Sequence, residues 1–141
     1  MRTGAITLSI ESEFRNVFLI GLTINKIARS IPLSQQAAFE MEVAVVEAVN
    51  NAVEHAHRHR RDKRVTVQIK IQVDFIRLTV IDEGAPIQPE TFISAEAGME
   101  NASEIERGRG LAIIRALMDE VRCERKGKAN YVTLIKYVKR S

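Results

Sequence analysis

The chain has 141 residues, of which 45% are apolar and 5% aromatic, so it can form one domain with an aliphatic core but not two comfortable ones. Its net charge of +3 at pH 7 permits an anionic ligand without requiring nucleic acid. The single cysteine, Cys123, excludes an intramolecular disulfide and favours a reducing compartment. No apolar run approaches a membrane span and no signal peptide is apparent, so we expect a cytoplasmic domain without membrane contact.

The first third of the chain predicts one strand and two helices. Residues 5–11 alternate apolar and polar side chains, which indicates a strand. Apolar residues then recur at helical spacing from Phe14 to about Ser30, where Pro32 ends the helix. Ser34 is a suitable N-cap for a second helix that we expect to continue to Ala56. Its expected core positions are Phe39, Val43, Val46, Val49, Ala52 and Val53.

The remaining elements complete an α+β pattern. Residues 65–73 and 76–81 predict an antiparallel hairpin that turns near Asp74. A small, polar segment of about residues 86–107 has the length of a lid, and an amphipathic helix is expected to open at Gly108. Two strands, 121–126 and 131–138, close the chain around Gly127. This order favours a two-layer sandwich, with a mixed or mostly antiparallel sheet covered on one face by helices.

Three short motifs carry the candidate chemistry, and the first lies late in the second helix. Glu47, Asn51 and His55 follow one another at i, i+4 and i+8, roughly on one helix face. An amide oxygen is a hard ligand that suits Mg²⁺. A carboxylate one turn away can accept the proton of a hydroxyl that attacks phosphorus.

The second motif is Asp82 with Gly84, at the end of an apolar strand. A carboxylate at this place can accept a hydrogen bond from the exocyclic amino group of adenine. A glycine nearby lets the backbone approach a flat ring closely.

The third motif runs from Gly108 to Leu111 and includes Gly110. A glycine-rich helix start presents free N–H groups and the positive end of the helix dipole, which suits a polyphosphate. Arg107 and Arg109 flank this point and can pair with phosphate oxygens. The ordered triple therefore predicts a nucleotide site.

The triple resembles the GHKL superfamily of ATPases and kinases. Three segments are similar in sequence to the anti-sigma-factor serine/threonine kinases of bacterial partner-switching systems. They are Glu47-Ala-Val-Asn-Asn-Ala-Val-Glu-His55, Asp82-Glu-Gly84 and Gly108-Arg-Gly-Leu-Ala-Ile-Ile-Arg-Ala-Leu-Met-Asp119. The resemblance spans nearly the whole chain. It implies a single Bergerat-type sandwich domain over residues 1–141 that binds ATP and Mg²⁺ and phosphorylates a small antagonist protein on serine or threonine. It also implies a sigma factor or another regulator as partner, and a homodimer.

The resemblance assigns a role to each motif. It makes Glu47 the general base, Asn51 the Mg²⁺ ligand and Asp82 the residue that reads adenine. Gly84 follows that aspartate, and Gly108 and Gly110 lie under the phosphates. Pro86 stands where the superfamily often has a second glycine, and residues 86–107 contain no lysine, so phosphate contacts must come from Arg107, Arg109 or elsewhere.

Other interpretations of the sequence remain open. His55 suits a packing or hydrogen-bonding position beside the nucleotide better than a phospho-acceptor. The alternation of His55, His57 and His59 is more typical of a solvated basic helix end than of a metal site. The basic run of residues 58–64 lacks the interleaved aromatics of a nucleic-acid surface. The alternative function is a module that sequesters a regulator, with nucleotide structural or absent.

Overall fold

The computed structural model describes residues 3–56, 60, 62–86 and 102–138, with backbone alone for residues 55, 56 and 102–107. In this part of the chain no helix is long and apolar enough to cross a bilayer. The elements are, in order, β1 (Gly4–Glu11), α1 (Phe14–Arg29), α2 (Gln35–Asn51), a π-helical turn η1 (Ala52–Ala56), β2 (Arg64–Ile71), β3 (Phe75–Asp82), α4 (Ala102–Leu117), β4 (Glu120–Lys126) and β5 (Ala129–Tyr137).

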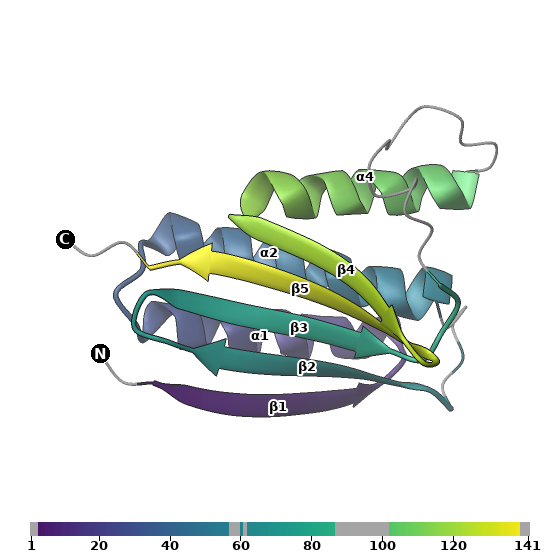
Figure 1. The fold of residues 1–141 in the computed structure, drawn as a ribbon, viewed down its shortest axis with the longest axis horizontal. Coiled ribbons are helices and arrows are strands. Elements are labelled where there is room, and N and C mark those ends of the chain that lie inside the picture. The colour runs from purple at the N-terminus through teal and green to yellow at the C-terminus, as the bar shows by residue number, and fades with distance from the viewer. Residues whose placement is uncertain (1–2, 57–59, 61, 87–101, 139–141) are drawn as a thin grey trace.

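The five strands form one sheet in the order β1-β2-β3-β5-β4, and each of its four pairings is antiparallel. The helices α1, α2 and α4 all lie on the same side of this sheet (Figure 1). The prediction of an α+β sandwich with helices on one face is therefore confirmed, and the sheet of the described residues is antiparallel rather than mixed.

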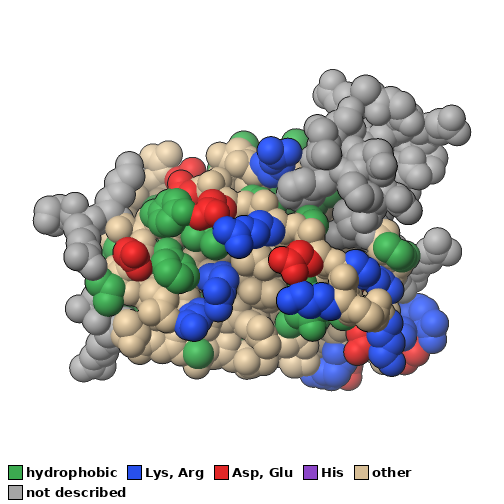
Figure 2. Space-filling model, in the orientation of Figure 1, with side chains coloured by type: hydrophobic (Ala, Val, Ile, Leu, Met, Phe, Trp, Pro, Cys, Tyr) green, Lys and Arg blue, Asp and Glu red, His purple; other side chains and the backbone are tan. Residues whose placement is uncertain are grey.

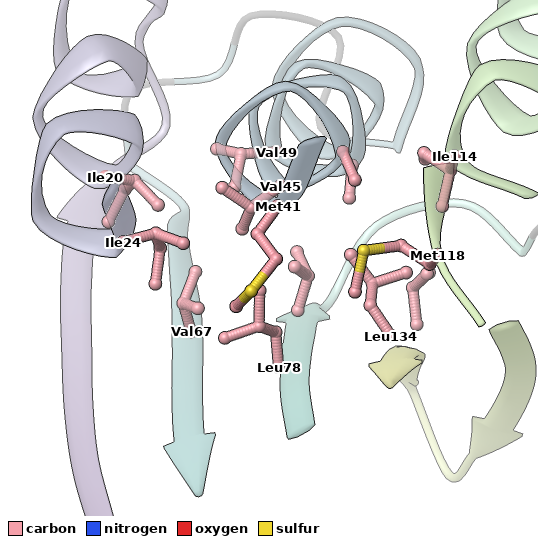
Figure 3. Close-up of a cluster of buried hydrophobic side chains, with 14 of the residues drawn as sticks. Ile20, Ile24, Met41, Val45, Val49, Val67, Leu78, Ile114, Met118 and Leu134 are labelled. Atoms are coloured by element: carbon pink, nitrogen blue, oxygen red, sulfur yellow. The ribbon is translucent and has the colours of Figure 1, made fainter. Parts of the chain in front are cut away.

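The core lies between the sheet and the three helices. Alternate residues of β2 and β3 are buried, as the period-two pattern predicts. Figure 3 shows Ile20 and Ile24 of α1, Met41 and Val45 of α2 and Met118 after α4 pointing towards strand residues such as Leu78 and Leu134. The opposite face of the sheet is solvated, and Figure 2 shows basic and acidic side chains interspersed on it.

The predicted core stripe of α2 is partly wrong. Phe39 is 60% exposed, and Val43 and Val46 are only half-buried. The buried positions are smaller because α2 is packed against α1 and α4 as well as the sheet. Alanine allows that close approach, and the buried residues of α2 are Ala38, Met41, Ala44, Val45, Ala48, Val49 and Asn51.

The start of α2 agrees with the prediction, but the end of α2 and the start of α4 differ from it. Ser34 caps α2 as expected, because its Oγ accepts a 3.0 Å hydrogen bond from the backbone N–H of Ala37. The α-helix ends at Asn51, however, and η1 continues with the wider π-helical turn, so His55 does not keep an α-helical i+8 relation to Glu47. The helix α4 begins at Ala102 rather than at Gly108. Most of the residues before Gly108 favour a helix, and the two glycines at positions 108 and 110 do not end a helix that packs against α2.

Candidate functional site

The first and third motifs meet where α4 packs against α2. A β-carbon added to Gly110 would lie 3.1 Å from Glu47 Oε2 and 3.3 Å from Asn51 Oδ1. Two oxygens from successive turns of α2 therefore converge on one point of α4. Only glycine leaves this contact without crowding, which explains a glycine in the interior of a helix.

Asn51 is a buried polar residue of α2 whose side-chain nitrogen is unpaired within the described part of the chain. It is 8% exposed, and among the described residues its Nδ2 is a buried nitrogen without a hydrogen-bond partner. An unpaired buried amide costs free energy, so this nitrogen does not stabilise the fold through hydrogen bonding within the described residues. Its oxygen lies on the same side as the Glu47 carboxylate.

A magnesium ion fits this donor set only together with a phosphate ligand. The described residues contain no cluster of three or more His, Cys, Asp or Glu side chains that would hold a metal. Mg²⁺ commonly takes one or two protein oxygens and completes its shell with substrate phosphates and water. The Oδ1 atom of Asn51 can supply one such oxygen, with the Glu47 carboxylate beside it.

Asp82 occupies the last position of β3, and its side chain is 4% exposed. Its Oδ1 accepts hydrogen bonds from the backbone N–H of Gly84, at 2.9 Å, and from Asn130 Nδ2, at 2.8 Å. Gly84 is therefore held in a tight turn directly behind the carboxylate, as the turn chemistry of the sequence predicts.

The motifs lie at one end of the molecule. The π-helical turn that follows Asn51 contacts β3, the strand that ends with Asp82. Figure 1 places η1, the end of β3 and the N-terminal half of α4 at the same end of the sandwich, opposite the two chain termini.

The other predicted residues divide into three groups. Gly108 and Leu111 are buried on α4, and Arg109 is exposed. The side chains of His55 and Arg107 lie outside the described part of the chain, as does most of the segment 86–107 expected to be a lid. Because α4 starts at Ala102, the two glycines are not at its N-terminus. The prediction that the positive end of the helix dipole lies at Gly108 is therefore wrong.

The chain matches the model of the histidine kinase-like ATPase domain over residues 10–136. The chain belongs to this family. Among its relatives, the serine-protein kinase RsbW of Listeria innocua is 31% identical over 121 residues, which cover 83% of this chain and 77% of that protein. RsbW of Staphylococcus aureus is 27% identical over 140 residues, 96% of this chain and 87% of that protein. The predicted resemblance to this branch of the family is confirmed.

Solved structures of the family share the fold. A Mycobacterium tuberculosis protein solved with its RsbU and RsbW domains superposes with a TM-score of 0.68 at 18% identity, over 94% of this chain and 31% of that one. The chain thus spans about a third of that longer protein. The catalytic domain of the histidine kinase ThkA, in a nucleotide-free form, gives a TM-score of 0.58 at 12% identity over 94% and 97% of the two chains.

Two residues that contact the second motif, Asp82 with Gly84, were not predicted from the sequence. Asn130 bonds Asp82, and Arg125 bonds both Asn130 and the carbonyl of Gly84. A signal for Asn130 existed, because it precedes Val132 and Leu134 at period two and so places a polar side chain on the core face of a strand. The expected strand began two residues too late, at Tyr131, and left Asn130 in the turn.

Proposed function

We propose that this chain is a Mg-ATP-dependent protein kinase that phosphorylates a serine or threonine of a small antagonist protein and thereby controls a sigma factor or another regulator. The observation that carries the proposal is the convergence of the Glu47 carboxylate and the Asn51 amide oxygen at Gly110. Membership of the histidine kinase-like ATPase family supports the nucleotide, and relatives named serine-protein kinase support the reaction.

The chemistry follows from the residue types. The hydroxyl oxygen of the substrate attacks the γ-phosphorus, the bond from that phosphorus to the β,γ-bridging oxygen breaks, and ADP leaves. Glu47 accepts the hydroxyl proton, since its carboxylate lies on α2 beside the proposed metal ligand Asn51. Bound Mg²⁺ would neutralise developing charge on the phosphate oxygens.

The remaining site residues bind and orient the nucleotide in this proposal. Asp82 accepts a hydrogen bond from the amino group of adenine, and Gly84 lets the adenine ring approach the backbone. Gly108 and Gly110 leave space for the phosphates beside Leu111. Arg107 and Arg109 are proposed to pair with phosphate oxygens, and His55 to lie beside the nucleotide.

We further propose that the protein forms a homodimer through β1 and α1. Phe14, Phe18 and Leu22 form an apolar stripe on α1, and the last two are 58% and 57% exposed. The strand β1 stands at one edge of the sheet, where Ile6 is also exposed. An exposed edge strand beside apolar side chains is a common site of protein association.

The same stripe favours the alternative function, a module that sequesters a regulator without turnover. Pro86, at the start of the lid segment, is compatible with that alternative because it removes a backbone donor. Calorimetry with ATP and ADP separates the two functions. A dissociation constant of about 1 mM corresponds to a binding free energy of about −4 kcal/mol. If neither nucleotide binds even this tightly, the sequestering module is favoured.

The kinase proposal is tested with γ-labelled ATP, Mg²⁺ and a lysate of the organism that encodes this chain. Wild type is expected to label a small protein on serine or threonine, and Glu47→Ala to lower the initial rate by about 100-fold or more. Glu42→Ala, on the same helix, serves as a matched control and should label normally. Equal labelling by wild type and Glu47→Ala would remove Glu47 from the mechanism.

A further inference from the structure

A buried polar pair connects the ends of β3 and β5. Asp82 and Asn130 are directly opposite in the antiparallel register, and they are 4% and 2% exposed. Both face the helix side of the sheet, in line with the buried positions of their strands. Their contact joins residues 48 positions apart through a 2.8 Å hydrogen bond from Asn130 Nδ2 to Asp82 Oδ1.

Both polar atoms of the Asn130 amide have hydrogen-bond partners. Its second N–H donates to the carbonyl of Ala85 at 2.8 Å, and its Oδ1 accepts from Arg125 at 3.1 Å. The same guanidinium nitrogen of Arg125 donates to the carbonyl of Gly84 at 2.7 Å. Each bond fixes the amide in one orientation, because a flipped amide would place donors against Arg125.

This network distinguishes the two oxygens of Asp82. Its Oδ1 receives both donors, from Asn130 and from the backbone of Gly84. From the described residues, Oδ2 receives none, so it keeps its accepting capacity for a ligand. A carboxylate held by two donors on one oxygen cannot rotate freely, and its other oxygen is preorganised.

We propose that Asn130, held in turn by Arg125, is a positioning residue that fixes Asp82 with Oδ2 free to accept the exocyclic amino group of adenine. The inference rests on the proposed nucleotide site and assigns base selectivity to residues on β4 and β5. Arg125, which donates to the carbonyl of Gly84, and Asn130, which donates to the carbonyl of Ala85, also tie the hairpin of β4 and β5 to the turn after β3. Selectivity for the base and the path of that turn therefore depend on the same contacts.

The test compares ATP with purine riboside triphosphate, which carries hydrogen in place of the 6-amino group. Calorimetry with wild type should show a preference for ATP, and Asp82→Ala defines how much of that preference the carboxylate supplies. Asn130→Ala is expected to reduce the preference by about tenfold, mainly by weakening ATP binding. Arg125→Ala, at an exposed position, should reduce it in the same direction by about threefold.

Controls separate positioning from general damage. Arg122→Ala removes another exposed arginine of β4, one that pairs with Glu120, and should leave the preference unchanged. If Asn130→Ala lowers the affinity for both nucleotides by the same factor, the positioning role is overturned, because a general loss of structure does not discriminate between bases. If Asn130→Ala does not unfold cooperatively, Arg125→Ala decides, and an unchanged preference there overturns the proposal.

Failure of the underlying function gives a different result. A wild type that binds neither nucleotide overturns the proposed kinase and this inference together. A wild type that prefers ATP, with the same preference in Asn130→Ala and Arg125→Ala, overturns the positioning role alone.

Discussion

Gly110 of α4 stands so close to Glu47 of α2 that a methyl group on its α-carbon would come within 3.1 Å of the carboxylate oxygen Oε2. The same methyl group would come within 3.4 Å of both polar atoms of the Asn51 amide. The residues proposed for proton transfer and for metal binding therefore lie in the contact between two helices. We therefore expect substitutions at this contact to change ATP affinity more than the free energy of unfolding.

Gly110→Ala is expected to impair nucleotide binding while leaving the fold intact. Alanine favours the helix by about 1 kcal/mol over glycine, which offsets much of the cost of crowding Glu47 and Asn51. We expect the free energy of unfolding to change by less than about 1 kcal/mol and ATP affinity to fall by about tenfold. Chemical denaturation and calorimetry measure the two quantities.

Ala112→Gly provides the matched control for that helix. Ala112 is exposed on α4, so this change reports the helix propensity without touching Glu47. It should cost about 1 kcal/mol of stability and leave ATP affinity unchanged. Unchanged ATP affinity in Gly110→Ala would show that the contact with α2 does not form part of the nucleotide site.

Asn51→Ala should abolish the dependence of ATP binding on Mg²⁺ with little loss of stability. The change removes a buried nitrogen that has no partner among the described residues, so its desolvation cost of about 1–3 kcal/mol disappears and compensates for lost packing. In wild type, removal of Mg²⁺ with EDTA should weaken ATP binding. Asn51→Ala should bind ATP equally with and without Mg²⁺, whereas the neighbouring Asn50→Ala should behave as wild type.

Phe18→Ser should shift the proposed dimer towards monomer. Phe18 is 58% exposed, so the change affects the folded monomer little, but it removes apolar surface from the α1 stripe. Analytical ultracentrifugation should show the dimer dissociation constant raised by about tenfold or more. Val73→Ser, at an exposed apolar residue between β2 and β3, is the control. A monomeric wild type at micromolar concentration would contradict the dimer.

Lys136→Met should destabilise the fold far from the candidate site. The Nζ of Lys136 donates to the carbonyl of Leu117, the last residue of α4, at 2.7 Å, and lies 3.4 Å from Glu40 Oε1. Methionine matches the stem but leaves that carbonyl and the carboxylate without their partner, at a cost of about 1–3 kcal/mol. Denaturant unfolding measures this, with Lys70→Met on the solvated face of the sheet as a near-neutral control. A loss equal to that of the control would show that the contact contributes nothing.

The hydrophobic pattern of the sequence predicts the elements well where one face of an element is buried. Strands β2 and β3 follow strict alternation, and the Ser34 cap of α2 is found where expected. The pattern failed for Phe39, because packing of α2 between two helices selects small side chains and turns the phenylalanine outward. It failed again at the start of α4, where local glycine chemistry was outweighed by packing against α2.

The amino-acid sequence by itself determined the order of strands and helices, the aliphatic core and the three motifs that mark the family. Those properties are local, because period and residue type are set within a few positions of the chain. Only the tertiary structure decided that Gly110 meets Glu47 and Asn51, and that Asn130 holds one oxygen of Asp82. These contacts join residues about 50 or more positions apart, and they exist because α4 packs on α2 and β5 pairs with β3.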